Sequence, residues 1–462
     1  MSRERRTLSG LPVLCVAACL ALGCSGDDDG ADVADAAASE PVDRDDGGAA
    51  APIDRPKTDA AITPRDAGGN QPDPERDATV ARQGTSDAAV GNDAGTTAST
   101  YTLDCGPNGV VMESAGPPKN RVNYVIVGDG YTKDQLDTLY VQHIQKALTK
   151  RFSPIGEPYG RYRKFVNICA LKLASETSPI GKGATALKCT GDDQSRLARC
   201  DERAADMAIS DNVPAGFEVD WKAVVLNNDR WWNTGSVLML WSGANESAAG
   251  AALHEGGHGF HQLADEYGGT NGNCAREYNE VNSTADMTTT AGKWERWLSF
   301  DQVGATGRQG AFAGSRYCDA DQYRPSSNSM MNSLFGENPN TSFNAVSREK
   351  MIMDIWRIVR PIDATTPPAG AVSGAMTLSV RVVDPAVVDV DWSVDGKVVA
   401  AKGGELFDLA ARGLSAGVHT VTARAYDNAG EELVRYRDGG NSYGRMNWSK
   451  SQQTVTWTVT LP

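Results

Sequence analysis

Short apolar runs and one stretch with helical spacing follow one another between residues 123 and 241. Four apolar runs bounded by turn residues predict buried strands at 123–128, 165–173, 223–226 and 239–241. Helical spacing predicts a helix over 133–151, where the apolar positions include Leu136, Leu139, Ile144 and Leu148. Strands that alternate with helices indicate an α/β unit.

Beyond residue 369 the pattern changes to alternating apolar and polar positions. The alternation predicts short strands at 377–383, 388–394, 397–399, 419–426 and 454–459. Short strands separated by turn signals are typical of a β-sandwich of immunoglobulin-like type. We therefore expect an α+β or α/β domain at 101–365, followed by an accessory β-sandwich at 369–462. A helix over 343–356 closes the first domain.

The first 24 residues place an apolar run between positive charges and a cysteine. Three arginines precede the run at 11–22, and Cys24 follows it. This layout predicts a secretory signal at 1–24 with a lipobox-like end, and the run is too short for a permanent membrane span. We expect an exported chain at the cell surface or outer membrane, tethered through a lipid on Cys24. Plain secretion after cleavage at a nearby site is the alternative.

Residues 25–100 lack the side chains that build a core. They consist largely of Asp, Ala, Gly, Pro and Thr and contain no aromatic residue, so we expect a disordered linker. The segment holds 17 acidic and 6 basic residues, which accounts for most of the formal charge of −14. The rest of the chain carries much less charge, so composition gives no argument for nucleic-acid binding.

Six cysteines follow the predicted signal. An even number favours disulfides in an exported chain. Proximity in the sequence favours three pairs: Cys189 with Cys200, Cys274 with Cys318, and Cys105 with Cys169. A cysteine zinc site is the alternative, but the Cys-x-x-Cys spacing that such sites use is absent.

The stretch from 254 to 267 carries the candidate chemistry. His254 and His258 stand at i and i+4, one helical turn apart, so both imidazoles can reach one metal ion. Glu255 stands beside them, in position to take a proton from water. The pattern predicts a catalytic zinc site, and the alternative is a histidine pair satisfied within a core helix.

A catalytic zinc normally takes three protein ligands, so one more is needed. In a straight helix Asp265 would lie about 16 Å along the axis from the first histidine, too far to share the metal. If the chain turns soon after His258, helped by Gly259, the Asp265 carboxylate can complete the site. Glu266 is the alternative third ligand. His261 is expected to support a ligand or line the cleft.

Two further segments, 228–233 and 271–319, are candidates for the walls of a substrate cleft. Residues 228–233, which include Trp231 and Trp232, precede an expected edge strand at 235–237. They form either part of a substrate-binding edge or a surface loop. The stretch from 271 to 319 is polar and rich in loops, and we expect it to frame the cleft.

The motif His254-Glu255-x-x-His258, followed by Leu263-Ala264-Asp265-Glu266-Tyr267, resembles the immunoglobulin-A peptidase family of secreted zinc metallopeptidases. Further similarity lies at 125–132, 324–331 and 343–346, so the resemblance covers residues 101–365. It implies a metzincin-like zinc peptidase domain. It also implies a Met-turn, an apolar floor beneath the ligands, with Met331 as first candidate and Met330 as second. Relatives tend to have glycine at position 261, where this chain has histidine.

We therefore expect a zinc metalloendopeptidase that acts on a protein or peptide substrate. Glu255 would be the general base, and zinc would be held by His254, His258 and Asp265. Tyr267 and Tyr323 are candidate donors to the oxyanion. The alternatives are another zinc amide hydrolase, such as an aminopeptidase or amidase, and a surface-displayed binding lipoprotein with an inactive or structural zinc domain. Specificity lies in the cleft walls, so the resemblance does not name the substrate.

Overall fold

A computed structural model describes residues 101–462 apart from 271, 287–291, 303–305, 334–340 and 438–447. The described residues belong to one compact unit, Asp93–Pro462, which is called the second unit below because Met1–Asn92 precede it in the chain. The predicted signal at 1–24, its Cys24 and the predicted linker at 25–100 lie outside the described residues. All structural statements below concern the second unit.

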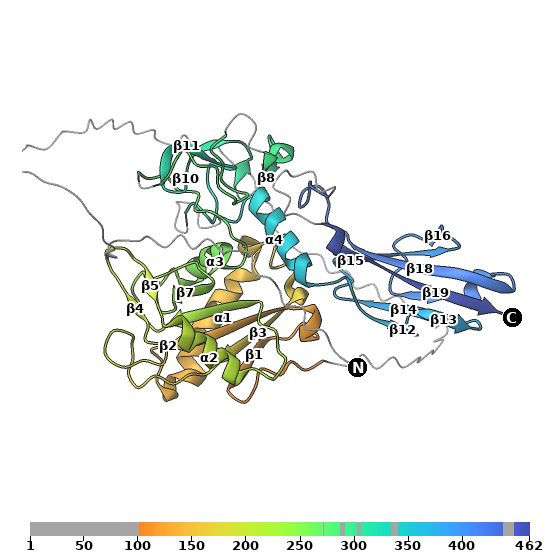
Figure 1. Cartoon of the computed structure of the whole chain (residues 1–462), viewed down its shortest axis with the longest axis horizontal. Coiled ribbons are helices and arrows are strands. Elements are labelled where there is room, and N and C mark those ends of the chain that lie inside the picture. Colours follow the sequence, from red (N-terminus) through yellow and green to blue (C-terminus); the bar gives the residue numbers. More distant parts are fainter. Residues whose placement is uncertain (1–100, 271, 287–291, 303–305, 334–340, 438–447) are drawn as a thin grey trace, which may run out of the picture. The chain divides into compact units, whose positions relative to one another are not determined.

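A five-stranded sheet organises the first part of this unit (Figure 1). In spatial order its strands are β1 (Gly109–Glu113), β3 (Val166–Leu171), β2 (Val122–Asp129), β6 (Trp221–Leu226) and β7 (Leu238–Ser242). The last four are parallel, and β1 pairs antiparallel with β3. The four predicted strands are therefore confirmed with small shifts of their ends, whereas β1 was not expected. β7 forms one edge of the sheet and leads into the next helix.

Alternate residues of the strands face two separate cores. Tyr124 and Ile126 of β2 pack with residues of α1 (Val141–Arg151) and α3 (Ala248–Gly259), whereas Val125 and Val127 pack with residues of α2 (Glu202–Asn212). A sheet covered on both faces needs continuous apolar strands, which explains the short apolar runs. The helix expected over 133–151 is divided into a 3₁₀ turn (Lys133–Gln135), a π turn (Leu136–Tyr140) and α1.

Three short antiparallel pairs and one helix complete this part. The pairs are β4 (Thr190–Gly191) with β5 (Ala198–Arg199), β8 (Asp301–Gln302) with β9 (Gly307–Arg308), and β10 (Phe312–Ser315) with β11 (Cys318–Arg324). The helix is α4 (Ala345–Ile358). The structure confirms the three predicted disulfides, Cys105–Cys169, Cys189–Cys200 and Cys274–Cys318. The second closes the β4–β5 hairpin, and the third anchors the start of β11.

The C-terminal part consists of two sheets. One contains β12 (Ile362–Thr366), β14 (Thr377–Val382) and β17 (Leu406–Asp408). The other contains β13 (Gly370–Ser373), β19 (Gln452–Leu461), β18 (Gly417–Asp427), β15 (Val388–Val394) and β16 (Lys397–Ala400). The ring of Trp392 in the second sheet stacks on Phe407 of the first, with ring centres 4.9 Å apart. The two sheets thus share a core, and the immunoglobulin-like assignment stays a prediction.

Buried hydrogen bonds connect the C-terminal part with the α/β part. The carboxylate of Asp427, at the end of β18, accepts hydrogen bonds from the Tyr162 hydroxyl at 2.5 Å and from Trp356 Nε1 at 2.6 Å. All three side chains are almost fully buried. The interface between the α/β part and the C-terminal part is therefore buried around Asp427.

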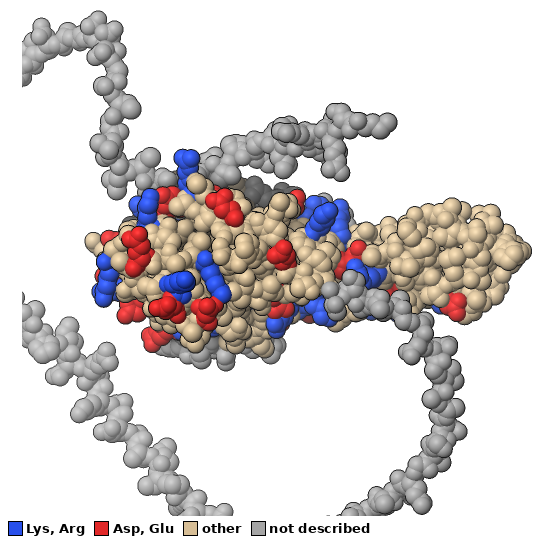
Figure 2. Space-filling view, turned by 90° about the horizontal axis from the view of Figure 1, so that it is seen from below, with Lys and Arg blue, Asp and Glu red and all other residues tan. Residues whose placement is uncertain are grey.

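Charged side chains of both signs are mixed on the surface. On the face shown in Figure 2, Lys and Arg alternate with Asp and Glu over the α/β part. Such a surface does not build a large field of one sign on that face. Among the described residues, no helix has the length and apolar character needed to cross a membrane.

Candidate active site

The helix α3 presents His254, Glu255 and His258 close to the edge of the sheet. Its second half packs against a methionine: a Cβ at Gly257 would lie 2.5 Å from Met331 Sδ. A side chain at Gly257 would require this sulfur to shift, so the glycine lets the helix approach the methionine closely. The helix can therefore sit directly on the segment that contains Met331.

The chain turns soon after the second histidine, and Gln262 makes the turn. α3 ends at Gly259, Gln262 has φ of +54°, and its N–H donates to the His258 carbonyl at 3.0 Å. A left-handed residue with this hydrogen bond is a recognised helix ending. Gly259 keeps helical geometry, so the expectation that it helps the turn is wrong. A glycine at position 261 is not needed for this turn, because the left-handed residue lies one position later.

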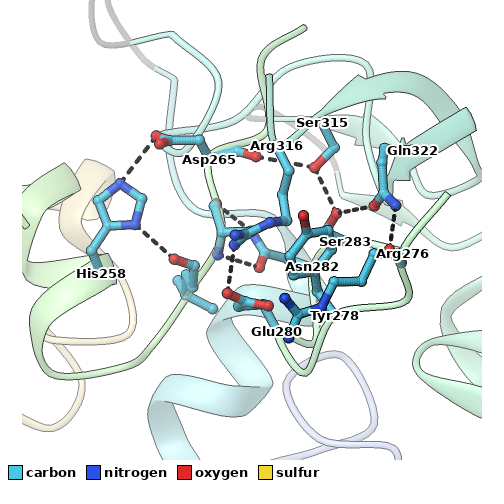
Figure 3. Close-up of polar contacts among 12 residues, drawn as sticks. His258, Asp265, Arg276, Tyr278, Glu280, Asn282, Ser283, Ser315, Arg316 and Gln322 are labelled. Atoms are coloured by element: carbon cyan, nitrogen blue, oxygen red, sulfur yellow. Dashed lines mark hydrogen bonds and ion pairs between the residues drawn. The ribbon is translucent and has the colours of Figure 1, made fainter. Parts of the chain in front are cut away.

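After this turn, the Asp265 carboxylate points back toward both histidines. Asp265 Oδ1 lies 3.1 Å from His254 Nε2 and 3.0 Å from His258 Nε2, and the two Nε2 atoms are 3.0 Å apart. The other ring nitrogens bond to backbone carbonyls, His254 Nδ1 to Met330 at 2.9 Å and His258 Nδ1 to Leu263 at 2.7 Å. Figure 3 shows the contact between His258 and Asp265. Both Nδ1 atoms therefore act as donors to backbone carbonyls, and both Nε2 atoms point at Asp265.

These three atoms fit the ligand set of a catalytic zinc ion. Two imidazoles and a carboxylate are a known catalytic set, and ligands at about 2.0 to 2.2 Å from a tetrahedral ion lie roughly 3.3 Å from one another. Burial alone would raise the pKa of Asp265, but the imidazoles of His258 and His254 hold it well below its usual value. The site thus keeps a carboxylate ionised where the three ligand atoms meet, which favours a bound cation.

Glu255 lies beside the ligand atoms on the cleft side. Ligand atoms of His254, Glu255 and His258 all lie within 4.8 Å of one another, although Asp265 Oδ1 is closer to both imidazoles. A Cβ at Gly235 would lie 2.7 Å from Glu255 Oε2, so the backbone at this glycine closes directly over the carboxylate. Burial raises the pKa of Glu255, and the neighbouring histidines oppose that rise. Such an environment suits a carboxylate that accepts a proton.

A cleft of ≈ 450 Å³ opens beside Glu255 and His254. Its lining comes from several segments: Ser195, Arg196, Leu197, Trp231, Asn233, His254, Glu255, Tyr267, Tyr317, Asn332 and Ser333. One wall is the β4–β5 hairpin with residues 231–233, and the other includes the turn between β10 and β11. The two tryptophans expected at this edge differ in role, because Trp231 lines the cleft while the ring of Trp232 covers Gly191 of the hairpin.

Tyr317 is a candidate functional residue that sequence reasoning missed. Its hydroxyl donates to Asp265 Oδ2 at 2.8 Å, and the Tyr267 hydroxyl donates to Tyr317 Oη at 3.1 Å. Burial, followed by the charge of Asp265, raises the pKa of Tyr317 to about 12, so the phenol stays a hydrogen-bond donor at neutral pH. Of the two tyrosines predicted as donors, Tyr267 lines the cleft, whereas Tyr323 pairs with Thr284 outside the cleft lining.

The turn that carries Tyr317 has an unusual sequence. Arg316 and Tyr317 have φ of +49° and +62° and occupy both central positions between β10 and β11. A two-residue hairpin turn with both central φ values positive normally contains Asn-Gly. Two large residues here cost conformational energy, which points to a role for their side chains. Tyr317 is 45% exposed although its hydroxyl reaches a buried carboxylate.

The polar loop region holds Asp265 through its backbone (Figure 3). The Asp265 carbonyl accepts from Arg316 N at 2.9 Å and lies 3.0 Å from Ser315 Oγ. Arg316 in turn pairs with Glu280 at 2.5 Å and covers the Tyr278 ring, with 3.8 Å between the guanidinium carbon and the ring centre. The stretch expected to frame the cleft therefore also positions the third candidate ligand.

Glu266 and His261 face away from the candidate metal centre. Glu266 is fully buried and accepts hydrogen bonds from Asn282 at 2.8 Å, from Asn344 at 2.8 Å and from Ser329 at 2.6 Å. Its carboxylate is committed to these donors, so the alternative of Glu266 as third ligand is wrong. It instead connects the segment that carries Asp265 with the start of α4 and with Ser329, next to the two methionines.

His261 belongs to the core. It is fully buried, with Nε2 2.7 Å from the Tyr159 hydroxyl and Nδ1 3.0 Å from Asp354 Oδ2 on α4. Burial lowers the pKa of His261 to about 4, so the ring is neutral at pH 7. The expectation that His261 supports a ligand directly or lines the cleft is wrong, because its ring anchors the end of α3 to α4.

Both methionines of the expected Met-turn are buried next to the histidines. Met331 Sδ lies under Gly257, as described above, and the Met331 carbonyl accepts from Glu266 N at 2.8 Å. Met330 contributes its carbonyl to His254 Nδ1. The segment thus gives an apolar floor and also orients one imidazole.

An α/β domain with His-Glu-x-x-His on a helix beside an edge strand, and a carboxylate returned to the histidines by a turn, is typical of metallopeptidases. Residues 110–304 match the family model described as IgA Peptidase M64, so this part of the chain is similar to the peptidases of that family. The match supports a peptidase, a hydrolase of peptide bonds. The match includes both histidines, Glu255 and Asp265 but ends before Tyr317. The comparison with curated proteins found no match.

Proposed function

We propose that the protein is a zinc-dependent endopeptidase. The observation that carries the proposal is the convergence of His254 Nε2, His258 Nε2 and Asp265 Oδ1 within 3.1 Å of one another. These atoms would hold zinc. When bound there, zinc would act as a Lewis acid toward the scissile carbonyl and lower the pKa of water. The layout of residues 1–24 further supports export, with Cys24 as the site of a lipid tether.

The protein's own groups supply the proton transfers and the orientation. Glu255 would take a proton from the attacking water and deliver it to the leaving amine. Tyr317 lines the cleft, and its phenol would donate to the developing oxyanion once its single O–H turns away from Asp265 Oδ2. Hydrogen bonds to the Met330 and Leu263 carbonyls would keep the two imidazoles oriented.

The decisive test is the substitution Glu255→Gln in the full chain. Hydrolysis of peptides should fall by about 10²- to 10⁴-fold, because the general base is lost. Zinc content, measured by metal analysis after dialysis, should remain one ion per chain as in the unchanged protein. The matched control is Glu246→Gln, which makes the same chemical change at an exposed position just before α3.

The outcomes separate the alternatives. A fully active Glu255→Gln protein would refute the assigned base. Products trimmed only from one end would indicate an exopeptidase, and a zinc-loaded protein that cuts no peptide would indicate a binding protein. A chelator should abolish activity and added zinc should restore it if the ligand assignment is correct.

A further inference from the structure

One wall of the cleft is the hairpin of β4 and β5, which is closed at its base and attached at its tip. Cys189–Cys200 closes its base. Its tip is attached to the neighbouring segment, because the Arg196 carbonyl accepts from Asn233 N at 3.2 Å and Leu197 forms a bridge with Asn233. That segment continues to Gly235, which lies directly against Glu255. The backbone of Arg196 therefore has a defined position relative to the catalytic carboxylate.

Arg196 is the one Lys or Arg side chain among the described residues that line the cleft. Nearby carboxylates have other partners: Asp193 binds Arg230 at 3.0 Å and Trp232 Nε1 at 2.9 Å. Asp192 accepts from the backbone of Ser195. Within the part of the chain that the structure describes, the Arg196 guanidinium has no hydrogen bond or ion pair, and the side chain is exposed to the cleft.

The backbone conformation of Arg196 is a second indication that its side chain has a binding role. Its φ is +61°, and its N–H donates to the Asp192 carbonyl at 2.8 Å across the tip of the hairpin. Glycine adopts this conformation at no steric cost, whereas other L-residues pay for it. An arginine at a position that would suit glycine, and with no intramolecular partner for its charge, points to a partner that arrives from outside.

We propose that Arg196 binds a carboxylate of the peptide substrate and so makes the enzyme prefer acidic substrates. The inference rests on the proposed peptidase function. A guanidinium matches a carboxylate in shape and charge through two parallel hydrogen bonds. The carboxylate comes from an Asp or Glu side chain or from the C-terminus of the peptide. Because the mixed charges on the surface face shown in Figure 2 build no field of one sign, this preference would arise inside the cleft.

The test compares peptide pairs that differ in one carboxylate, with the zinc-loaded full chain as enzyme. One set replaces Gln by Glu at each position around the cleavage site, in peptides with amidated ends. A second set compares free and amidated C-termini. We expect kcat/KM to be about 3- to 10-fold higher for the acid in one set, and this ratio to shrink in high salt. The set that shows the effect identifies the source of the carboxylate.

Three variants connect the preference to this side chain. Arg196→Gly removes the charge at a position whose backbone favours glycine, and the ratio should fall to about one. Arg196→Glu should invert it. Arg199→Glu makes the same charge change on β5 outside the cleft lining, and it should keep the preference. Cleavage with no preference, or a preference that persists in Arg196→Gly, would overturn the inference alone. No cleavage of any peptide would overturn the proposed function and the inference with it.

Discussion

At the scale of single residues, the hydroxyl of Tyr317 connects the third candidate ligand with the cleft. It bonds to a carboxylate that also faces two imidazoles, and it lies at the rim of the cleft. Substitution by phenylalanine removes two hydrogen bonds, the one to Asp265 and the one from Tyr267, and leaves the ring in place. The effect on catalysis can therefore be separated from an effect on packing.

We predict that Tyr317→Phe lowers kcat by about 10²-fold with little change in KM, because an oxyanion donor acts mainly in the transition state. Zinc content should be unchanged. Steady-state kinetics on one peptide, with metal analysis of the same samples, checks this. Tyr323→Phe is the matched control and should be nearly neutral, since Tyr323 does not line the cleft. Equal losses in the two variants would contradict the assignment.

The sequence predicted part of the site because that part is local. His254, Glu255 and His258 lie within one helical turn, and Asp265 follows after a short turn. Tyr317 could not be found in this way, because it comes from a hairpin more than fifty residues later and no spacing rule connects the two. The only signal was a pair of large residues, Arg316 and Tyr317, directly before a cysteine.

At the scale of elements, the end of α3 decides whether a third ligand is available. The left-handed conformation of Gln262 ends the helix, and the side chain itself is exposed. Gln262 therefore ends the helix through its backbone conformation and not through a side-chain contact. The strands were predicted well because sheets covered on both faces have continuous apolar runs, whereas α2 was missed because its outer face is polar and only Ala205 and Ile209 are buried.

We predict that Gln262→Val lowers the free energy of unfolding by about 1 to 2 kcal/mol and weakens zinc binding, since a β-branched residue resists positive φ. Gln262→Gly should retain both properties. Urea denaturation and a zinc competition assay with a chelator measure the two effects. If the valine and glycine variants bind zinc equally well, the turn does not control the third ligand.

At the scale of the whole second unit, the C-terminal strands and the α/β part share buried polar contacts. Asp427 has three partners outside its own part, Tyr162, Trp356 and Arg161. Glu349 of α4 makes the reverse connection, since it accepts from the backbone N–H groups of Arg435 and Tyr436 at 2.7 Å each. Contacts of this kind favour an integral structural role for the C-terminal part.

We predict that Asp427→Ala destabilises the α/β part and the C-terminal part together, by roughly 2 to 4 kcal/mol, because it leaves buried donors unpaired. Unfolding followed by tryptophan fluorescence and by loss of activity should show one shared transition at lower denaturant. Asp408→Ala, at an exposed carboxylate of β17, should cost far less. Two separate transitions, with activity unaffected, would show that the parts are independent.

The Cys274–Cys318 disulfide lies next to the turn that carries Tyr317, so it connects the redox state of two cysteines with the geometry of the candidate active site. Cys318 directly follows Tyr317, and the same turn binds the carbonyl of Asp265. Oxidation of this one pair therefore fastens both the phenol and the third candidate ligand. A chain in which Cys274 and Cys318 are reduced would lack this covalent tether beside the catalytic centre, so activity is expected to depend on the redox state of this pair.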